Sequence, residues 1–156
     1  MATNDDRVFT VLIGFRRTAR LMVEELARRL EADGFGEIHP AYHSLFENID
    51  PGGTRLTELA ARAEMTHQSM SELVATLERR GWVERRPDPS DGRARLVCLT
   101  PEGRRLTARG LHHINEIEAA WQARWRDAGY DGQLRDVLAD AIANAELERQ
   151  TTSAAT

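Results

Sequence analysis

Apolar residues recur every three or four positions along several stretches of the chain, which is the spacing of amphipathic helices. The first stretch runs from Asp6 to Glu31, and Asp33-Gly34-Phe35-Gly36 ends it. Its apolar positions are Val8, Leu12, Phe15, Ala19, Met22, Leu26 and Leu30. A shorter helix is expected from His39 to Glu47, opening near Pro40, before Asp50-Pro51-Gly52-Gly53 forces a turn.

The middle of the chain predicts two short helices joined by a tight turn. After a short strand at Thr54 to Leu56, Thr57 is expected to cap a helix from Glu58 to Glu64. Thr66 is expected to cap a second helix, Gln68 to Arg80, with Gly81 as the residue that ends it. The inward positions are Leu59, Ala60 and Ala63 in the first helix and Met70, Leu73, Val74 and Leu77 in the second. This arrangement is typical of a helix-turn-helix.

A β-hairpin tipped with arginine is predicted directly after these helices. Its strands are Trp82 to Arg86 and Arg93 to Leu99, and Pro89 and Gly92 supply the turn chemistry. Thr100-Pro101-Glu102 then provides an N-cap, a proline in the first helical position and an early acid. The hairpin therefore forms the wing of a winged helix-turn-helix.

A long helix from Pro101 to Asp127 carries the next apolar stripe, and at 1.5 Å per residue it spans roughly 40 Å. Its stripe consists of Leu106, Gly110, Ile114, Ile117, Trp121 and Trp125. Gly129-Tyr130-Asp131-Gly132 breaks the chain before a last amphipathic helix marked by Leu134, Leu138, Ala141 and Ala145. A monomer of this size buries so many helical faces with difficulty, so we expect a homodimer. The expected organisation is one mainly α domain, 1–156, with a small β-wing: 54–100 form the winged module, and 6–50 and 101–148 a helical dimerisation region.

Composition and charge narrow the class of protein. The chain has 156 residues, 41% of them apolar, and a formal net charge of −4, which argues against a uniformly basic coat. Residues 55–109 nevertheless carry 11 arginines against eight acids, so the positive part is the predicted winged module. One cysteine, no apolar run of 18 residues and no signal peptide favour a cytoplasmic protein. The sequence contains no glycine-rich phosphate loop, nucleophile elbow or His-Glu-x-x-His motif, so it predicts neither an enzyme nor a cofactor.

Several motifs together resemble the multiple-antibiotic-resistance regulator (MarR) family of bacterial transcription factors. They are Leu56-Thr-Glu-Leu-Ala, Leu-Glu-Arg-Arg-Gly at the end of the second short helix, Trp-Val-Glu-Arg-Arg, and Asp88-Pro-Ser-Asp-Gly-Arg-Ala-Arg-Leu-Val-Cys-Leu-Thr-Pro-Glu-Gly-Arg. The match is specific over residues 54–106, and the helical order around it also fits. The resemblance implies a dimeric winged-helix repressor that binds double-stranded DNA and is released by a ligand.

The candidate DNA-binding residues are the polar positions of the second short helix and of the wing: Thr66, His67, Gln68, Ser69, Ser71, Arg79, Arg85, Arg86, Asp91, Arg93 and Arg95. Gln68 and Ser69 are the expected base readers, because glutamine pairs bidentately with adenine. The arginine at 93 is expected in the minor groove, and the other arginines on phosphates. By resemblance, Asp91 orients the wing rather than touching DNA. Two copies would read an inverted-repeat operator with half-sites roughly 34 Å apart.

Each of these residues also has a structural interpretation. Thr66 and Ser69 are suited to capping the helix, Asp91 to a plain turn, and any single arginine to a solvated surface. Glu72 departs from the resemblance, because a basic residue is common there in the family. An acid can accept from cytosine N4, weaken attraction to phosphate, or pair with a nearby arginine.

A small aromatic or phenolic effector is the expected ligand, by resemblance, between the dimerisation helices and the winged module. Candidate contacts are Arg16, Arg20, His39, Tyr42, His43 and His113, since an arginine with a tyrosine and histidines can hold an aromatic carboxylate. The alternative is that Tyr42 packs and the histidines lie at the surface or satisfy helix ends. His39 and His43, four residues apart, leave a zinc-responsive regulator open, and a winged module for protein contact is a further alternative. Cys98 is expected to fill space in the wing strand.

Overall fold

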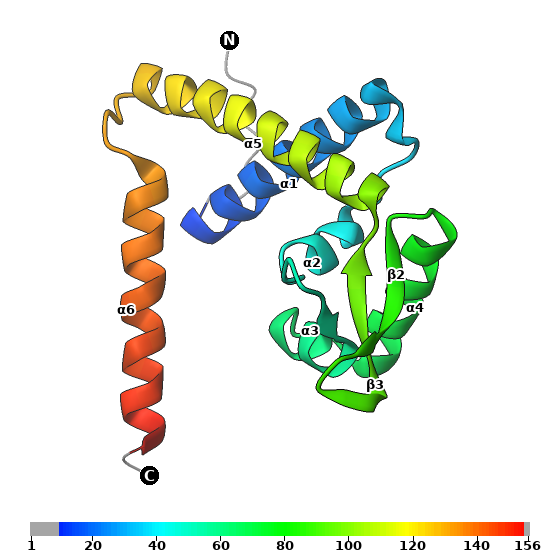
Figure 1. Cartoon of the computed structure of the whole chain (residues 1–156). Coiled ribbons are helices and arrows are strands. Elements are labelled where there is room, and N and C mark those ends of the chain that lie inside the picture. Colours follow the sequence, from blue (N-terminus) through cyan, green and yellow to red (C-terminus); the bar gives the residue numbers. More distant parts are fainter. Residues whose placement is uncertain (1–9, 155–156) are drawn as a thin grey trace. The chain divides into compact units, whose positions relative to one another are not determined.

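The computed structural model describes the backbone of residues 10–154 and the side chains of residues 10–151 (Figure 1). The sequence expected the first helix to start at Asp6 with Val8 on its apolar face, and both residues lie outside this range. The chain divides into two compact units, Met1–Ile114 and Asn115–Thr156. Its elements are helices apart from one small sheet, which confirms the expected mainly α winged-helix class.

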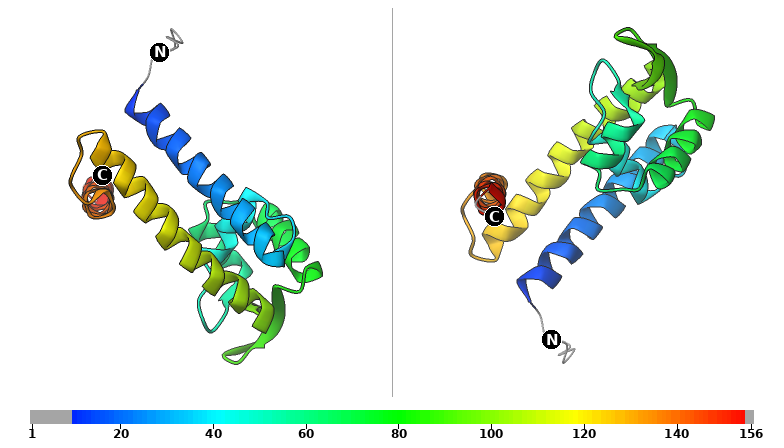
Figure 2. Two further views of the ribbon diagram at one scale, coloured as in Figure 1. Left: turned by 90° about the horizontal axis from the view of Figure 1, so that it is seen from above. Right: turned by 90° about the horizontal axis from the view of Figure 1, so that it is seen from below.

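The first unit begins with α1 (Val11–Leu30), whose N-cap Thr10 accepts a hydrogen bond from the backbone N–H of Ile13 at 3.2 Å. A π-helical turn, η1 (Glu31–Phe35), continues it and ends where Gly34 takes a positive φ of 91°. The expected shorter helix is present as η2 (Pro40–Tyr42) and α2 (His43–Phe46). In Figure 2 the end of α1 lies beside the first turns of α5 (Pro101–Asp127).

The helix-turn-helix consists of α3 (Leu56–Arg62) and α4 (His67–Arg79), preceded by β1 (Thr54–Arg55). The expected cap at Thr57 is wrong: α3 starts two residues before the expected Glu58, and Arg55 takes the N-cap position without a side-chain hydrogen bond. The cap at Thr66 is confirmed, since its Oγ accepts from the backbone N–H of Ser69 at 3.1 Å. Gly81 ends α4 in the left-handed region with φ of 73°.

The sheet has the strand order β1-β3-β2, all antiparallel, with β2 (Val83–Asp88) and β3 (Asp91–Leu99) forming the wing. Pro87 pairs with Arg95 but Asp88 pairs with Asp91, so residues 92–94 bulge out of β3. The turn itself is Pro89 and Ser90. Gly92, expected in that turn, is therefore a strand residue at the start of the bulge.

The core of the first unit lies between the helix-turn-helix, α2 and the sheet. Its fully buried apolar side chains are Leu45, Leu59, Met70, Val74, Leu77 and Val97. Helix α5 starts as the sequence predicted: Thr100 Oγ accepts from the N–H of Gly103 at 3.0 Å and donates to the carbonyl of Gly81 at 2.6 Å. Cys98 is buried in β3, as expected of a space-filling residue.

The second unit contains the end of α5 and α6 (Leu134–Ala154). Gly129 has a φ of 94°, and the side-chain amide of Gln122 donates to the carbonyl of Gly132 at 2.6 Å, which closes the turn between the helices. An ion pair joins Arg135 to Glu118 across the turn. Helix α6 leaves Val137, Ile142 and Leu147 more than half exposed. None of the helices within residues 10–154 has the length and apolar character needed to cross a membrane.

Candidate nucleic-acid interface

Helix α4 separates an apolar face from a polar one. Met70, Leu73, Val74 and Leu77 are buried against the core. Gln68, Glu72 and Arg79 follow one another at steps of four and seven residues on the opposite side, and all three are exposed. The polar face is therefore free to meet a partner along the whole helix.

Two candidate DNA-binding residues, Thr66 and Ser69, take part in the cap of α4. Besides accepting from the N–H of Ser69, the Thr66 hydroxyl lies 2.8 Å from the Ser69 hydroxyl. His67 opens the helix and is exposed, whereas Ser71 is half-buried on its flank. The hydrogen bonds of Thr66 and Ser69 thus agree with their interpretation as capping residues. Gln68 is the side-chain amide that this first turn of α4 exposes.

Glu72 does not pair with an arginine, contrary to one of the sequence hypotheses. Its carboxylate accepts from Nε2 of Gln68 at 3.1 Å, across one turn of α4. Within the described residues no arginine lies within ion-pair distance of it. The outer face of α4 therefore presents a joined glutamine and glutamate.

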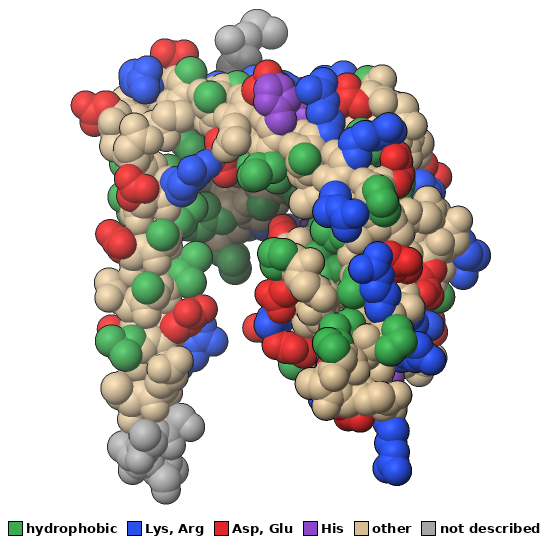
Figure 3. Space-filling model, in the orientation of Figure 1, with side chains coloured by type: hydrophobic (Ala, Val, Ile, Leu, Met, Phe, Trp, Pro, Cys, Tyr) green, Lys and Arg blue, Asp and Glu red, His purple; other side chains and the backbone are tan. Residues whose placement is uncertain are grey.

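The candidate arginines fall into two groups. Three of them hold neighbouring side chains: Arg79 donates to Thr76 at 2.9 Å, Arg85 lies 3.5 Å from Glu78, and Arg86 pairs with Glu84. Arg93 and Arg95 are exposed on β3, and their guanidinium groups have no partner among residues 10–151. In Figure 3 basic and acidic side chains are interspersed over the visible face of the winged module. The wing thus carries the arginines that are free to bind an anion.

The base of the wing is held by a carboxylate that the sequence analysis missed. Asp88 is 6% exposed, and Arg55 from β1 donates to it at 2.7 Å. Both the hydroxyl and the N–H of Ser90 also donate to Asp88, at 2.6 and 2.8 Å, and together with Arg55 they lower its pKa from 3.8 to about 2. Asp-Pro-Ser is a local turn signal for the Ser90 contact. No local signal points to Arg55, which lies 33 residues away.

Asp91 has a smaller role than Asp88. Its carboxylate is about half exposed and accepts from the backbone N–H of Arg93 at 3.1 Å, which holds the bulge of β3. Arg55 lies 3.9 Å from its other oxygen. Asp91 thus supports the backbone that carries Arg93.

A cavity of about 230 Å³ lies in the first unit, between α1, α2 and α5. Most of its lining residues are apolar, and the polar ones are Tyr42, His43, Glu47 and Thr107. The others are Leu26, Leu30, Ile38, Phe46, Leu106, Gly110, Leu111 and Ile114. Of the expected ligand contacts only Tyr42 and His43 line it. Nε2 of His43 is buried and has no hydrogen-bond partner among the described residues. His43 therefore lines the cavity and also carries an unsatisfied ring nitrogen.

The other expected ligand contacts lie elsewhere. Arg16 and Arg20 are exposed on α1, and Arg20 is 3.7 Å from Glu24. His39 caps η2 by accepting from the N–H of Ala41 at 3.2 Å. Neither arginine lines the cavity in this chain, because helical periodicity gives the face of a side chain but not the neighbour it meets.

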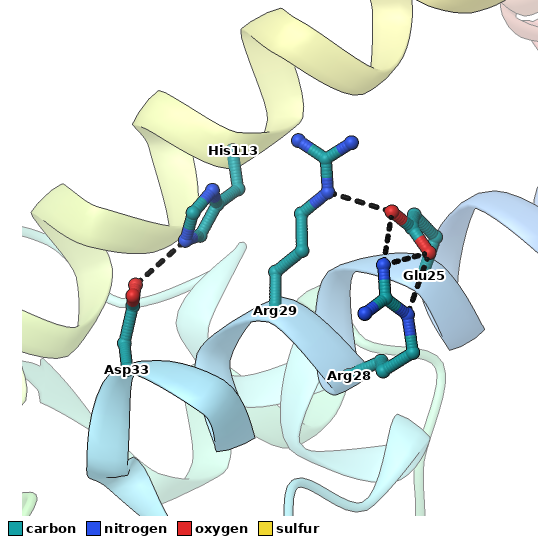
Figure 4. A network of polar contacts seen from close by, with 5 residues as sticks. All are labelled: Glu25, Arg28, Arg29, Asp33 and His113. Atoms are coloured by element: carbon teal, nitrogen blue, oxygen red, sulfur yellow. Dashed lines mark hydrogen bonds and ion pairs between the residues drawn. The ribbon is translucent and has the colours of Figure 1, made fainter.

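His113 belongs to a polar contact between η1 and α5 (Figure 4). Its Nε2 lies 2.6 Å from the carboxylate of Asp33, which also accepts from Arg109 at 2.6 Å. Arg109 first, and then His113, lower the pKa of Asp33 to about 2. On α1, Glu25 accepts from both Arg28 and Arg29. His113 thus joins helices, and no cluster of three or more metal-ligating side chains occurs within the described part of the chain.

Comparisons with known proteins agree with this architecture. The MarR family model matches residues 38–94, which span the helix-turn-helix and most of the wing. The transcriptional regulator HosA of Escherichia coli O111:H- is 35% identical over 85 residues, which are 54% of this chain and 63% of HosA. The chain thus matches less than two thirds of the length of that relative.

Solved structures extend the likeness to nearly the whole chain. Sco3205, a MarR family transcriptional regulator from Streptomyces coelicolor in complex with DNA, is 28% identical, with a TM-score of 0.62 and coverage of 90% of this chain and 89% of that one. MepR of S. aureus, solved as a DNA complex, shares the fold at 21% identity, with a TM-score of 0.66 and coverage of 91% and 99%. The winged module of this chain is thus similar to the MarR family model, and the fold of nearly the whole chain is similar to that of MarR family regulators.

Proposed function

We propose that the protein is a sequence-specific, DNA-binding transcriptional regulator, a ligand-responsive repressor that acts as a homodimer in the cytoplasm. The observation that carries this proposal is the combination of α4, with its exposed polar face, and a wing whose Arg93 and Arg95 have no partner among the described residues. An α-helix fits the major groove of B-DNA, and arginine is favoured in narrow minor grooves. That Sco3205 was solved with DNA supports the same assignment.

The homodimer is supported by apolar side chains that neither unit covers. Val11 and Leu12 at the start of α1 are 72% and 77% exposed. In the second unit, Val137, Ile142 and Leu147 of α6 are likewise more than half exposed. A second copy offers the same faces and buries both sets with twofold symmetry. Two copies of α4 related in this way require an inverted-repeat operator.

The cavity is the proposed effector site. An engineered cavity of about 150 Å³ holds benzene, so about 230 Å³ suits one substituted aromatic ring. None of the described arginines lines the cavity, whereas Glu47 does, which disfavours a carboxylate ligand. His43 supplies an imidazole at the cavity wall that can form a hydrogen bond with a hydroxyl group, so an uncharged phenol fits best.

A gel-shift experiment tests the DNA-binding proposal. The full chain is titrated onto the DNA upstream of its own coding sequence, with the Arg93→Ala, Arg95→Ala double variant as comparison. We expect salt-sensitive, sequence-dependent binding that the double variant weakens. If no upstream fragment binds more tightly than unrelated DNA of equal length, the proposal fails.

A further inference from the structure

Arg55 belongs both to the sheet and to the helix-turn-helix. It ends β1, where it pairs with Leu96 of β3, and it is the N-cap residue of α3. Its side chain crosses β3, the central strand, and reaches Asp88 at the end of β2. One residue therefore connects the start of the helix-turn-helix to the turn of the wing.

The Asp88 carboxylate divides its two oxygens between this arginine and the turn. Nε and Nη2 of Arg55 both approach Oδ2, at 2.7 and 2.6 Å. Oδ1 accepts from the hydroxyl and the N–H of Ser90, at 2.6 and 2.8 Å. At 6% exposure Asp88 has little contact with water, and a buried carboxylate that loses its cation is costly. Without Arg55 the turn would therefore have to shift until Asp88 reached water.

The wing depends on this contact because its own strand ladder is interrupted. Residues 92–94 bulge out of β3, and Pro87 has no N–H for the ladder. Arg93 lies in that bulge, and its N–H donates to Asp91, whose other oxygen is 3.9 Å from Nη2 of Arg55. The guanidinium of Arg55 thus faces both acids of the turn that carries Arg93.

The same two acids make Arg55 a poor ligand for phosphate. Asp88 is at hydrogen-bond distance and Asp91 at ion-pair distance, so a phosphate would have to compete with both carboxylates. A wing that is held in place before binding also loses less conformational entropy on the DNA. Arg55 is therefore placed to orient Arg93 rather than to bind the nucleic acid itself.

We propose that Arg55 is a positioning residue of the DNA interface, which acts by holding the wing turn so that Arg93 and α4 enter neighbouring grooves together. This proposal rests on the proposed DNA-binding function. Because Arg55 acts through Arg93, removing it affects operator affinity only while Arg93 is present.

The test is a set of double-mutant cycles on the full-length protein. The operator is a duplex that the wild type enriches from a random library, and fluorescence anisotropy measures the Kd of each variant for it. Arg55→Ala and Asp88→Ala are each made alone and together with Arg93→Ala. Far-UV circular dichroism establishes which variants are folded, and either cycle is sufficient by itself.

Arg62→Ala is the matched control for Arg55→Ala. Arg62 lies on α3, its side chain is 37% exposed against 43% for Arg55, and it also pairs with two acids. Those acids, Asp50 and Glu58, lie outside the wing. The two variants remove the same charge from the same module, and they differ in the contact with the wing.

We expect Arg55→Ala to weaken operator binding by about 3- to 30-fold, but by less than about twofold in the Arg93→Ala background. Asp88→Ala should behave in the same way. The two substitutions change the net charge in opposite directions, so a purely electrostatic effect on DNA would make Asp88→Ala bind more tightly than the wild type. Arg62→Ala should have the same effect with and without Arg93→Ala, whatever its size.

The outcomes separate this inference from the proposed function. If the wild type binds its operator and Arg55→Ala weakens binding equally in both backgrounds, the positioning role is wrong and DNA binding stands. Wild-type affinity of Arg55→Ala or of Arg93→Ala, or tighter binding by Asp88→Ala, has the same meaning. If neither Arg55→Ala nor Asp88→Ala folds, Arg55 serves the fold rather than the interface and the proposal is wrong. If the wild type enriches no sequence at all, the proposed function is wrong and the positioning role falls with it.

Discussion

Replacing Gly103 with alanine tests the packing between α5 and the wing. Gly103 lies in the first turn of α5 against the backbone of Trp82, which directly precedes β2. A Cβ atom at position 103 would lie 1.9 Å from the carbonyl oxygen of Trp82 and 2.9 Å from its carbonyl carbon. The same oxygen accepts from the N–H of Thr100 at 3.1 Å. The obstacle is therefore backbone, and a change of rotamer cannot remove it.

Two opposing terms set the expected magnitude. Overpacking costs about 1–3 kcal/mol, and this contact belongs at the upper end because helix and strand must move apart by about 1.5 Å to reach van der Waals distance. Alanine offsets up to about 1 kcal/mol of this through its higher helix propensity. The net loss in unfolding free energy is about 2 kcal/mol, which corresponds to a decrease in Tm of roughly 4–8 °C.

The same helix offers a matched control. At Gly110 a Cβ atom would meet only Cδ1 of Leu30, at 4.0 Å, which is ordinary contact. Gly110→Ala should therefore raise the unfolding free energy by about 0.5–1 kcal/mol. Urea unfolding followed by circular dichroism measures both variants. The reasoning is refuted if Gly103→Ala is as stable as the wild type, or if both variants shift in the same direction.

Three further predictions concern the wing and the cavity. Arg93→Ala should weaken operator binding by about 1–3 kcal/mol in fluorescence anisotropy and leave the oligomeric state unchanged. The control, Arg126→Ala in the second unit, should bind as the wild type does. Equal operator affinities of Arg93→Ala and the wild type would remove the wing from the mechanism. Because the folded pKa of Asp88 is about 2, below its ordinary 3.8, the stability that its contacts contribute is fully present above about pH 5 and is lost as the pH falls through 3.8 toward 2. The Tm difference between wild type and Asp88→Asn should thus narrow between pH 5 and pH 3, and a constant difference would contradict the assignment. His43→Leu removes the unsatisfied Nε2 and should raise the unfolding free energy by about 1 kcal/mol while abolishing thermal stabilisation by phenols; a less stable variant would show that Nε2 is satisfied.

Local signals were enough to predict the elements that position the site. The cap at Thr66 and the glycine at 81 define α4 because both act within one helical turn. Thr100 and Pro101 similarly define the start of α5, and its predicted end at Asp127 is also confirmed. Thr57 failed as a cap because the chain already turns into α3 from the end of β1.

Contacts between distant segments were outside the reach of the sequence. Arg55 meets Asp88 only because β1 pairs with β3, and β3 with β2. The absence of arginine from the cavity depends on the direction in which α1 turns its face. The contact between Gln68 and Glu72, in contrast, is a helical pair four residues apart, so spacing alone could have predicted it.

The most direct test of DNA recognition uses an operator that the full chain enriches from a random duplex library. Fluorescence anisotropy then compares this operator with a shuffled duplex of equal length and composition. Measurement at several salt concentrations separates phosphate contacts, which act on both duplexes, from base reading, which acts on one. We expect the operator to bind about a thousandfold or more tightly than the shuffled duplex at physiological salt, with affinity for both decreasing as salt rises. Equal affinity for the two duplexes would contradict sequence-specific recognition by α4 and the wing.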